Sequence, residues 1–519
     1  MSDLRTAWIF MALGSTGVLS AQVDSSALRY GQSISQVDLR AYLDTLANDA
    51  FEGRETAMPG QKKAASFLRE KFIGFGIPSI PDAAQRGLLN GYEQPFPLEV
   101  LTPGSMSISL NEKPIRFMED FFYFSEPLRG ELAVGAIAFV GFADSGADWT
   151  EAGPVALVLQ PPDTGAQKGK VPVGNFVLHL LDSLAAQSAQ SGVRLLFYGS
   201  EHAQAMMELY GGYITGPRMT LTGTSEGTPE PRRAQVVVID PKTADAILRH
   251  GRLTWKKAYK RAKRIPVAIH CTVVARNVPD LRELQGENVL GYIEGGGKKE
   301  ELIVVSAHYD HLGTSQGQIY NGADDDGSGT AAVLELAQAF ALAKRDGQGP
   351  TRSILFLAFS GEEKGLLGSE WYGEHPVFPM KNTVACLNMD MIGRVDTTHF
   401  AHERYVYVIG SDRLSTELHR INERMNETYT HLDLDYTYNA ADDPNRFYYR
   451  SDHYNFAQYG VPIIFFFNGD HEDYHQPTDD VWKIRFDLLE QRARLVFHVA
   501  WELANREERL VVDKPLPDE

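Results

Sequence analysis

The sequence predicts an α/β fold in which helices flank a mixed, mostly parallel sheet, with a smaller β-rich domain inserted into it. From about residue 286 onward, apolar strand-like runs alternate with helical segments, which is typical of a parallel sheet covered on both faces. Between about 126 and 265, short β-like runs replace this pattern. The 519 residues also exceed the roughly 250–300 that one hydrophobic core organises, so we expect two domains.

Residues 1–21 have the features of a cleavable export signal. Arg5 precedes an apolar run over 7–13, and small residues lead up to Ala21. The run is too short to span a bilayer, so we expect a secreted or periplasmic protein with no membrane anchor after cleavage. The alternative is an ordinary N-terminal helix, because Asp3 weakens the positive end that a signal needs.

The rest of the chain divides into three predicted parts. Residues 22–125 form the N-terminal part of the larger domain and contain a helical hairpin over 36–76. Residues 126–265 form the insert, and residues 266–519 complete the larger domain. In this last part we expect strands at 302–306, 354–359, 384–389, 405–409 and 462–467, and helices at 331–343 and 486–505.

The composition excludes some partners. Acidic residues outnumber basic ones by 68 to 50, a formal charge of −18, which repels phosphate backbones, so we expect no nucleic-acid partner. Cys271 and Cys386 lie in apolar runs that are typical of buried free thiols. A disulfide between them remains open at this point.

Polar residues interrupt the apolar scaffold directly after the predicted strands. The carboxyl ends of neighbouring strands face a common crevice, so these residues should converge there. His308 and Asp310 follow the strand at 302–306 and point the same way in extended chain, so Asp310 can orient His308 while His311 points elsewhere. Taken alone, a polar strand end at the surface explains this cluster equally well.

An acidic loop leads into the helix at 331–343. Asp324, Asp325 and Asp326 are flanked by glycines, and a single aspartate there would be read as a helix cap. Three successive carboxylates repel one another unless cations neutralise some of them, which favours a metal site. The spacing and the closing Glu of an EF-hand calcium loop are absent.

Three further segments complete the set of candidates. Glu362 and Glu363 follow the strand at 354–359, and because adjacent side chains diverge, one can bind a metal while the other reaches the attacking water. Asp390 lies among apolar residues, where a buried carboxylate needs a hydrogen bond or a cation. His475 lies in a polar loop. Taken singly, the glutamate pair also suits a solvated loop, and His475 a surface position.

Together these segments resemble metallopeptidase family 28, the co-catalytic zinc aminopeptidases and their glutamate carboxypeptidase relatives. The matching stretches are His-Tyr-Asp-His-Leu-Gly at 308–313, Gly-Ala-Asp-Asp-Asp-Gly-Ser-Gly at 322–329, Gly-Glu-Glu at 361–363, Asn-Met-Asp-Met at 388–391 and Tyr-His-Gln-Pro-Thr-Asp at 474–479. Glu-Gly-Arg at 52–54 also resembles the family, and the insert resembles a protease-associated domain. The resemblance implies a zinc-exopeptidase-like fold.

The resemblance also implies two Zn²⁺ ions and a role for each matched residue. The implied metal ligands are His308, Asp325, Glu363, Asp390 and His475, with Asp325 bridging both ions. Glu362 is the implied general base, Asp310 the partner of His308, and Tyr448 a helper at the oxyanion. A cis peptide bond is implied between Asp325 and Asp326.

We therefore expect a zinc-dependent exopeptidase, an aminopeptidase that releases N-terminal residues from a peptide or protein substrate. The alternatives are a glutamate-carboxypeptidase-like dipeptidase and a glutaminyl-cyclase-like acyltransferase with one zinc. A non-catalytic binding protein that keeps the fold and a two-metal phosphoesterase fit the sequence less well, because the full ligand set is present. The preferred side chain, the natural substrate and the oligomeric state stay open.

Overall fold

The structure, a computed structural model, describes residues 23–125, 128–143, 147–161, 175–222, 233–260 and 267–516. The predicted export signal lies outside these residues. The chain forms two compact units, one made of Met1–Pro95 and Glu287–Glu519 and the other of Phe96–Gly286. The second unit extends past the expected insert at both ends, because strands β1 (Glu93–Thr102) and β13 (Asp280–Ile293) run from one unit into the other.

A mixed sheet is the centre of the first unit. Its strands follow the order β20-β19-β21-β18-β14-β17-β13-β1. Strands β21, β18, β14 and β17 are parallel, whereas β13 and β19 pair antiparallel with their neighbours β17 and β21, which confirms the predicted fold class. The bounds are β14 (Lys298–His308), β17 (Arg352–Phe359), β18 (Thr383–Met389), β19 (Tyr405–Ile409), β20 (Asp433–Asp435) and β21 (Ile463–Phe467), with a separate hairpin of β15 (Gly313–Ser315) and β16 (Gln318–Tyr320).

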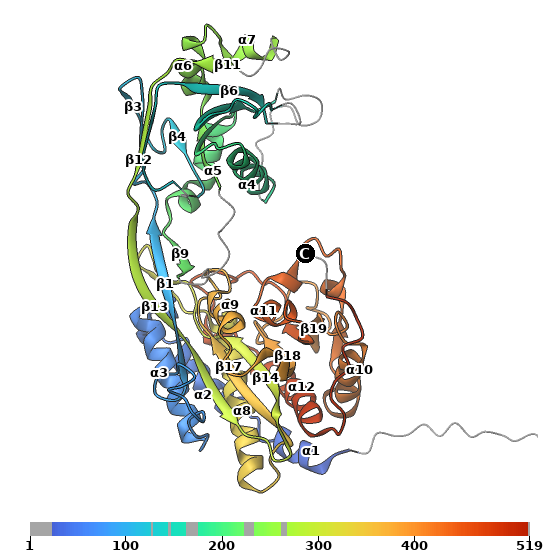
Figure 1. Ribbon diagram of the computed structural model, residues 1–519. Helices are drawn as coiled ribbons and strands as arrows, with labels where there is room; N and C mark the ends of the chain where they lie inside the picture. The colour runs from blue at the N-terminus through green and yellow to red at the C-terminus, as the bar shows by residue number, and fades with distance from the viewer. Residues whose placement is uncertain are drawn as a thin grey trace, which may run out of the picture. The chain divides into compact units, whose positions relative to one another are not determined.

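The central parts of the strands are apolar because helices cover both faces of this sheet. Successive residues of a strand point to opposite faces, so Val305 joins the core under one helical layer and Val304 the core under the other. Figure 1 shows α2, α8 and α12 beside the central strands. The first layer contains α1 (Ser25–Gly31), α2 (Gln36–Leu46), α3 (Pro59–Gly74), α8 (Gly329–Arg345), α10 (Thr416–Met425) and α12 (Phe486–Asn505), and the second contains α9 (Leu367–Glu374) and α11 (Tyr454–Ala457).

The second unit has its own sheets and cores. A six-stranded sheet has the order β11-β6-β7-β8-β10-β4, a four-stranded sheet the order β3-β2-β12-β5, and β9 pairs with β1. The strands are β2 (Ser107–Leu110), β3 (Lys113–Ile115), β4 (Phe121–Phe122), β5 (Gly130–Val134), β6 (Ile137–Phe142), β7 (Val155–Leu159), β8 (Leu195–Gly199), β9 (Arg218–Leu221), β10 (Gln235–Ile239), β11 (Val267–Ile269) and β12 (Val273–Asn277). The helices are α4 (Asn175–Gln190), α5 (Ala203–Thr215), α6 (Pro241–His250) and α7 (Trp255–Lys260).

The fold answers one question that the sequence left open, whether the two cysteines form a disulfide. Cys271 and Cys386 are both buried and free, and the Cys386 thiol lies on β18, 3.5 Å from the Ser306 hydroxyl. Among the described residues, no helix is long and apolar enough to cross a membrane.

Candidate metal centre

The candidate ligands meet at one edge of the sheet because the strands that carry them are parallel. His308 is the last residue of β14, Glu362 and Glu363 follow β17, and Asp390 follows β18. The loop after β21, the next parallel strand, carries His475. The carboxyl ends of parallel strands share an edge, so these groups converge although they are far apart in sequence.

Asp325 lies at the centre of this group, and its two carboxylate oxygens face different partners. The Oδ1 atom lies 3.4 Å from Nε2 of His308, which is also 3.5 Å from Oδ1 of Asp390. The Oδ2 atom lies 3.2 Å from Nε2 of His475, which is also 3.2 Å from Oε2 of Glu363. The site therefore has two halves that share one carboxylate.

The chemistry of these donors fits metal cations. Oδ2 of Asp325 and Oε1 of Glu363 are buried, and neither has a hydrogen-bond partner within the described chain. A buried ionised carboxylate without such a partner needs a cation. Imidazole nitrogens combined with carboxylate oxygens form a donor set that suits zinc.

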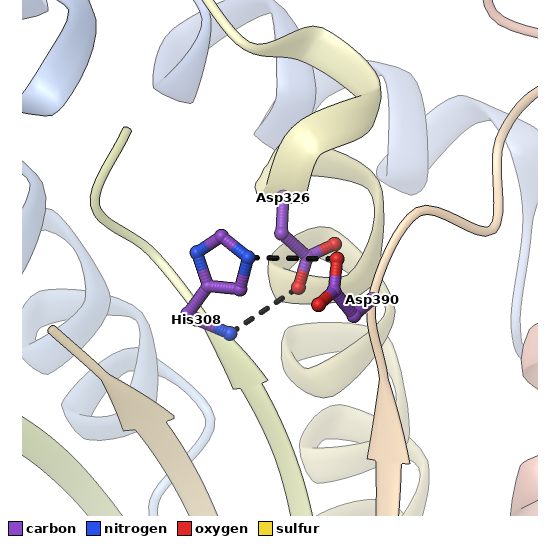
Figure 2. Close-up of side chains that lie close together, drawn as sticks. All are labelled: His308, Asp326 and Asp390. Carbon is purple, nitrogen blue, oxygen red and sulfur yellow. Dashed lines mark hydrogen bonds and ion pairs between the residues drawn. The ribbon is translucent and has the colours of Figure 1, made fainter. Parts of the chain in front are cut away.

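A third acid, Asp326, ties the site together. Its carboxylate accepts the backbone N–H groups of His308 (3.2 Å), Gly329 (2.8 Å) and Met391 (3.1 Å). Figure 2 shows the contact between the His308 backbone N–H and Asp326, and beside it the contact between the His308 ring and Asp390. Asp326 also lies within metal-binding reach of both residues, but three N–H donors already occupy it. Its role is therefore to join the ends of β14 and β18 to the start of α8.

His311 corrects one expectation from the sequence. We expected its side chain to point away, yet it is fully buried and its Nδ1 lies 2.7 Å from Oε1 of Glu363 and 3.8 Å from Oδ2 of Asp325. Together these three residues form a second possible ligand group. Strand alternation failed as a guide because β14 ends at His308 and the chain is no longer regularly extended beyond it.

Asp310 lies beside His308, but its backbone makes the closer contact. Nδ1 of His308 lies 3.1 Å from the Asp310 carbonyl oxygen and 3.8 Å from its carboxylate. The carboxylate instead accepts the Thr56 hydroxyl at 2.6 Å and the backbone N–H of Glu362 at 3.3 Å. Asp310 thus links the imidazole of His308 to the loop that carries the two glutamates.

Glu362 faces the interior of the site. Its Oε2 lies 3.9 Å from Nε2 of His308. Burial, together with the carboxylates of Asp390 and Glu363, holds the pKa of Glu362 well above its ordinary value, although His308 acts in the opposite direction. A carboxyl group with a raised pKa beside the reacting atoms suits a general base that works near neutral pH.

A hollow of about 350 Å³ opens beside these carboxylates. It is lined by Asp325, Glu362, Asp390, Met391, Phe447, Arg450, Phe465, Phe467, Asp470, Tyr474 and His475. Tyr448 is not in this lining: its ring is buried under the guanidinium of Arg413, and its hydroxyl has no hydrogen-bond partner in the described chain. The phenol that does reach the hollow is Tyr474, whose ring stacks on His475 with centroids 3.9 Å apart.

Two supporting residues were in the matched stretches, but the sequence assigned them no role. Arg54 is fully buried and donates to the carbonyl oxygens of Leu46, Tyr309, Asn321 and Gly322 at 2.6–2.9 Å. The contacts with Asn321 and Gly322 fix the chain directly before the acidic loop Asp324–Asp326. Asp479 is the second supporting residue, and its carboxylate accepts the backbone N–H of Asp325.

The peptide bond between Asp325 and Asp326 is cis, as the resemblance implies.

Comparisons with known proteins support the fold class and the family resemblance. The fold and the site define an α/β domain with a His, Asp and Glu metal centre at the edge of its sheet. Residues 288–500 match the sequence profile of Peptidase family M28, so the chain carries a domain of that family. A probable leucine aminopeptidase of Arthroderma otae is 32% identical over 216 residues, which are 40% of this chain and 56% of that protein.

Two further relatives extend the comparison. Aminopeptidase YwaD of Bacillus subtilis is 29% identical over 219 residues, which are 41% of this chain and 43% of the relative. The chain thus spans about half the length of the curated relatives it matches. The solved structure of an aminopeptidase from Aneurinibacillus sp. strain AM-1 has a TM-score of 0.52 at 17% identity, with 94% of this chain and 98% of that chain covered. This likeness shows a shared fold.

Proposed function

We propose that this protein is a zinc-dependent exopeptidase, specifically an aminopeptidase that removes N-terminal residues from peptides or proteins. The observation that carries the proposal is the shared carboxylate of Asp325, with His308 and Asp390 on one side and His475 and Glu363 on the other. The curated relatives named above are aminopeptidases, which supports this activity over the other chemistries of the fold.

In this proposal His308 and Asp390 would hold one Zn²⁺, His475 and Glu363 would hold the other, and Asp325 would contribute to both sites. When bound, the two ions polarise the scissile carbonyl and lower the pKa of the attacking water. His311 supports Glu363 from the buried side. A glutaminyl-cyclase-like acyltransferase would need one half of this arrangement, so the presence of both halves favours hydrolysis.

The protein residues carry the proton transfers. Glu362 takes a proton from the attacking water as the C–O bond forms, and it then delivers this proton to the nitrogen of the leaving amine as the C–N bond breaks. Asp310 accepts the backbone N–H of Glu362 and so fixes the loop that presents this base. The hydroxyl of Tyr474, rather than that of Tyr448, is placed to donate to the substrate carbonyl oxygen, because it lines the hollow.

Two further expectations belong to this proposal. Export to the periplasm or the exterior, with cleavage at about residue 21, suits an enzyme that meets extracellular peptides. The second is that the second unit, Phe96–Gly286, is the protease-associated domain that the resemblance implies.

The test combines metal exchange with removal of the base. Hydrolysis of leucyl-p-nitroanilide should stop when a chelator removes the metal and return with zinc. Glu362→Gln should lower kcat by about 10²–10⁴-fold with zinc still bound, because only the proton acceptor is lost. Glu374→Gln, an exposed acid on α9, is the matched control. Full activity of the Glu362 variant, or faster cleavage of N-blocked peptides than of free ones, would contradict the proposal.

A further inference from the structure

Arg450 places a cation in the hollow near Asp470, whose pKa it acts to lower, but the two side chains form no ion pair. It follows the short turn Phe447–Tyr449, its Cζ lies 4.6 Å from the centre of the Phe447 ring, and its Nη2 donates to the Tyr474 hydroxyl at 3.4 Å. Within the described ranges, no carboxylate oxygen lies within 4.0 Å of the guanidinium. Arg450 is exposed, so the guanidinium is accessible to a ligand.

Other arginines of the same region have protein partners. Arg394 pairs with Asp473 at 3.0 Å, and Arg413 donates to the carbonyl oxygens of Asn439 and Ala440 at 2.8 Å each. Arg54 uses its donors on backbone carbonyls beneath the acidic loop. Arg450 thus differs from these neighbours in having donor capacity left for a ligand.

The surroundings of Arg450 strengthen its attraction for an anion. Met391, Phe447, Phe465 and Phe467 give the hollow an apolar wall, and an apolar wall weakens the screening of a charge. The planar guanidinium matches the two oxygens of a carboxylate, and a charge-assisted pair of this kind is among the stronger hydrogen bonds. Asp325, Glu362 and Asp390 lie at the candidate metal centre, and the carboxylate of Asp470, which Arg450 influences electrostatically, forms no ion pair with the guanidinium.

We propose that Arg450 binds a carboxylate of the substrate, so that peptides carrying one close to the scissile bond are preferred. This inference rests on the proposed peptidase function and names its substrate class. The carboxylate has two chemical sources: an acidic side chain on the N-terminal residue, or the free C-terminus of a dipeptide. Both place an anion within one or two residues of the bond that is cut.

A structural role for Arg450 makes a different prediction. Arg450 contacts Tyr474, and the Tyr474 ring stacks on His475, so a purely positioning role would act through the metal centre. Loss of the guanidinium would then slow every substrate equally and lower the zinc content. Substrate binding by Arg450 predicts instead a loss confined to substrates that carry the carboxylate.

The experiment compares four substrates with the zinc-loaded full chain. They are leucyl-p-nitroanilide, glutamyl-p-nitroanilide, Leu-Gly and Leu-Gly-amide. Arg450→Gln should lower kcat/KM by about 10-fold or more for a carboxylate-bearing member and by less than about 2-fold for the neutral members. A loss on the glutamyl substrate assigns the side chain, and a loss on Leu-Gly but not its amide assigns the C-terminus.

Two variants sharpen the result. Arg450→Glu should turn the preference toward lysyl-p-nitroanilide, because the charge in the hollow is reversed. Arg446→Gln is the matched control: Arg446 stacks on the Tyr449 ring at 4.7 Å in the same turn but is not in the lining of the hollow. Equal losses on all four substrates, or no loss on any, would overturn the inference while leaving the peptidase proposal intact.

A binding measurement tests the role of Arg450 even if the protein proves not to be a peptidase, because it needs no turnover. Calorimetry would compare glutamate and leucinamide on zinc-loaded Glu362→Gln protein, with and without Arg450→Gln. Weaker binding of glutamate alone in the double variant supports the role of Arg450. Equal binding of both ligands in the two proteins overturns it, whatever the outcome of the activity assays.

Discussion

Asp479 anchors the backbone at Asp325: its Oδ2 accepts the backbone N–H of Asp325 at 3.1 Å and that of Asp324 at 2.9 Å. Both contacts are buried. The acidic loop is thus anchored by a residue more than 150 positions away in the chain. The orientation of the Asp325 carboxylate toward both halves of the site depends on this anchor.

We predict that Asp479→Ala weakens zinc binding by about 10–100-fold, because outer partners of metal ligands commonly have effects of this size. Asp479→Asn should retain most of the affinity, since its amide oxygen can still accept both N–H groups. Competition with a chromophoric chelator measures the affinities. Equal affinity in the alanine and asparagine variants would show that the anchor does not act on the metal centre.

We predict that His311→Gln weakens one of the two zinc sites. The imidazole lies 2.7 Å from Oε1 of Glu363, so its loss frees that carboxylate to turn away from its proposed ion. The expected result is a fall from two bound ions toward one when zinc is limiting, measured by metal analysis after dialysis. The exposed His402→Gln is the control. Two ions retained with unchanged affinity would remove His311 from the metal centre.

We predict that Arg54→Met destabilises the fold by about 3–5 kcal/mol, as is usual when one partner of a buried charged network is removed. Four carbonyl oxygens would lose their donor, and the nearby carboxylates would lose their buried cation. Arg54→Lys keeps the charge without the planar set of donors, so its loss should be smaller. Denaturant unfolding of the metal-free proteins gives the free energies, and a wild-type value for Arg54→Met would contradict the prediction.

We predict that Glu335, a buried residue of α8 that is not part of the candidate metal centre, makes the free energy of unfolding depend on pH. Burial raises the pKa of this carboxyl group to about 8, while the backbone N–H of Ser35, which it accepts at 2.8 Å, acts in the opposite direction. The folded state therefore keeps a proton that the unfolded chain releases near pH 4.5. The stability that this group contributes is complete below that pH and falls as the pH rises toward 8.

Glu335→Gln should remove this pH dependence, because the amide stays neutral and still accepts the Ser35 N–H. The free energy of unfolding should increase relative to wild type between pH 5 and pH 8, at most by about 1.4 kcal/mol for each pH unit. Unfolding in the presence of a chelator keeps metal binding out of the comparison. The control is Glu300→Gln at the surface. A constant difference across this range would show that Glu335 is ionised in the folded protein.

The periodicity of the sequence predicted the scaffold well. The expected helices at 331–343 and 486–505 correspond to α8 and α12, and the strand at 405–409 has the same bounds as β19. These elements are buried on both faces or along a wide stripe, so their local pattern carries a strong signal. The extent of the second unit was harder to predict, because β1 and β13 are long strands with no local break where the chain passes between units.

Some residues of the candidate site could be predicted from the sequence, and others could not. His308, Asp325, Glu363, Asp390 and His475 stand out as polar residues directly after strands or in a loop rich in acids, and the structure brings them together. His311 and Tyr474 were missed because their directions depend on irregular chain beyond the strand ends. The resemblance implied a role at the oxyanion for Tyr448, and only packing shows that Tyr474 lines the hollow whereas Tyr448 does not.

The amino-acid sequence by itself determined the order of strands and helices, the positions of the polar residues at the strand ends, and the kind of metal that these residues suit. These properties follow from periods of two and 3.6 residues and from side-chain chemistry, which are local. The tertiary structure alone decided that Asp325 faces both halves of the site, that Asp479 and Arg54 hold the acidic loop, and that Arg450 lies in the hollow and donates to the Tyr474 hydroxyl. Those relationships join residues up to about 270 positions apart, and no local pattern in a chain encodes such contacts.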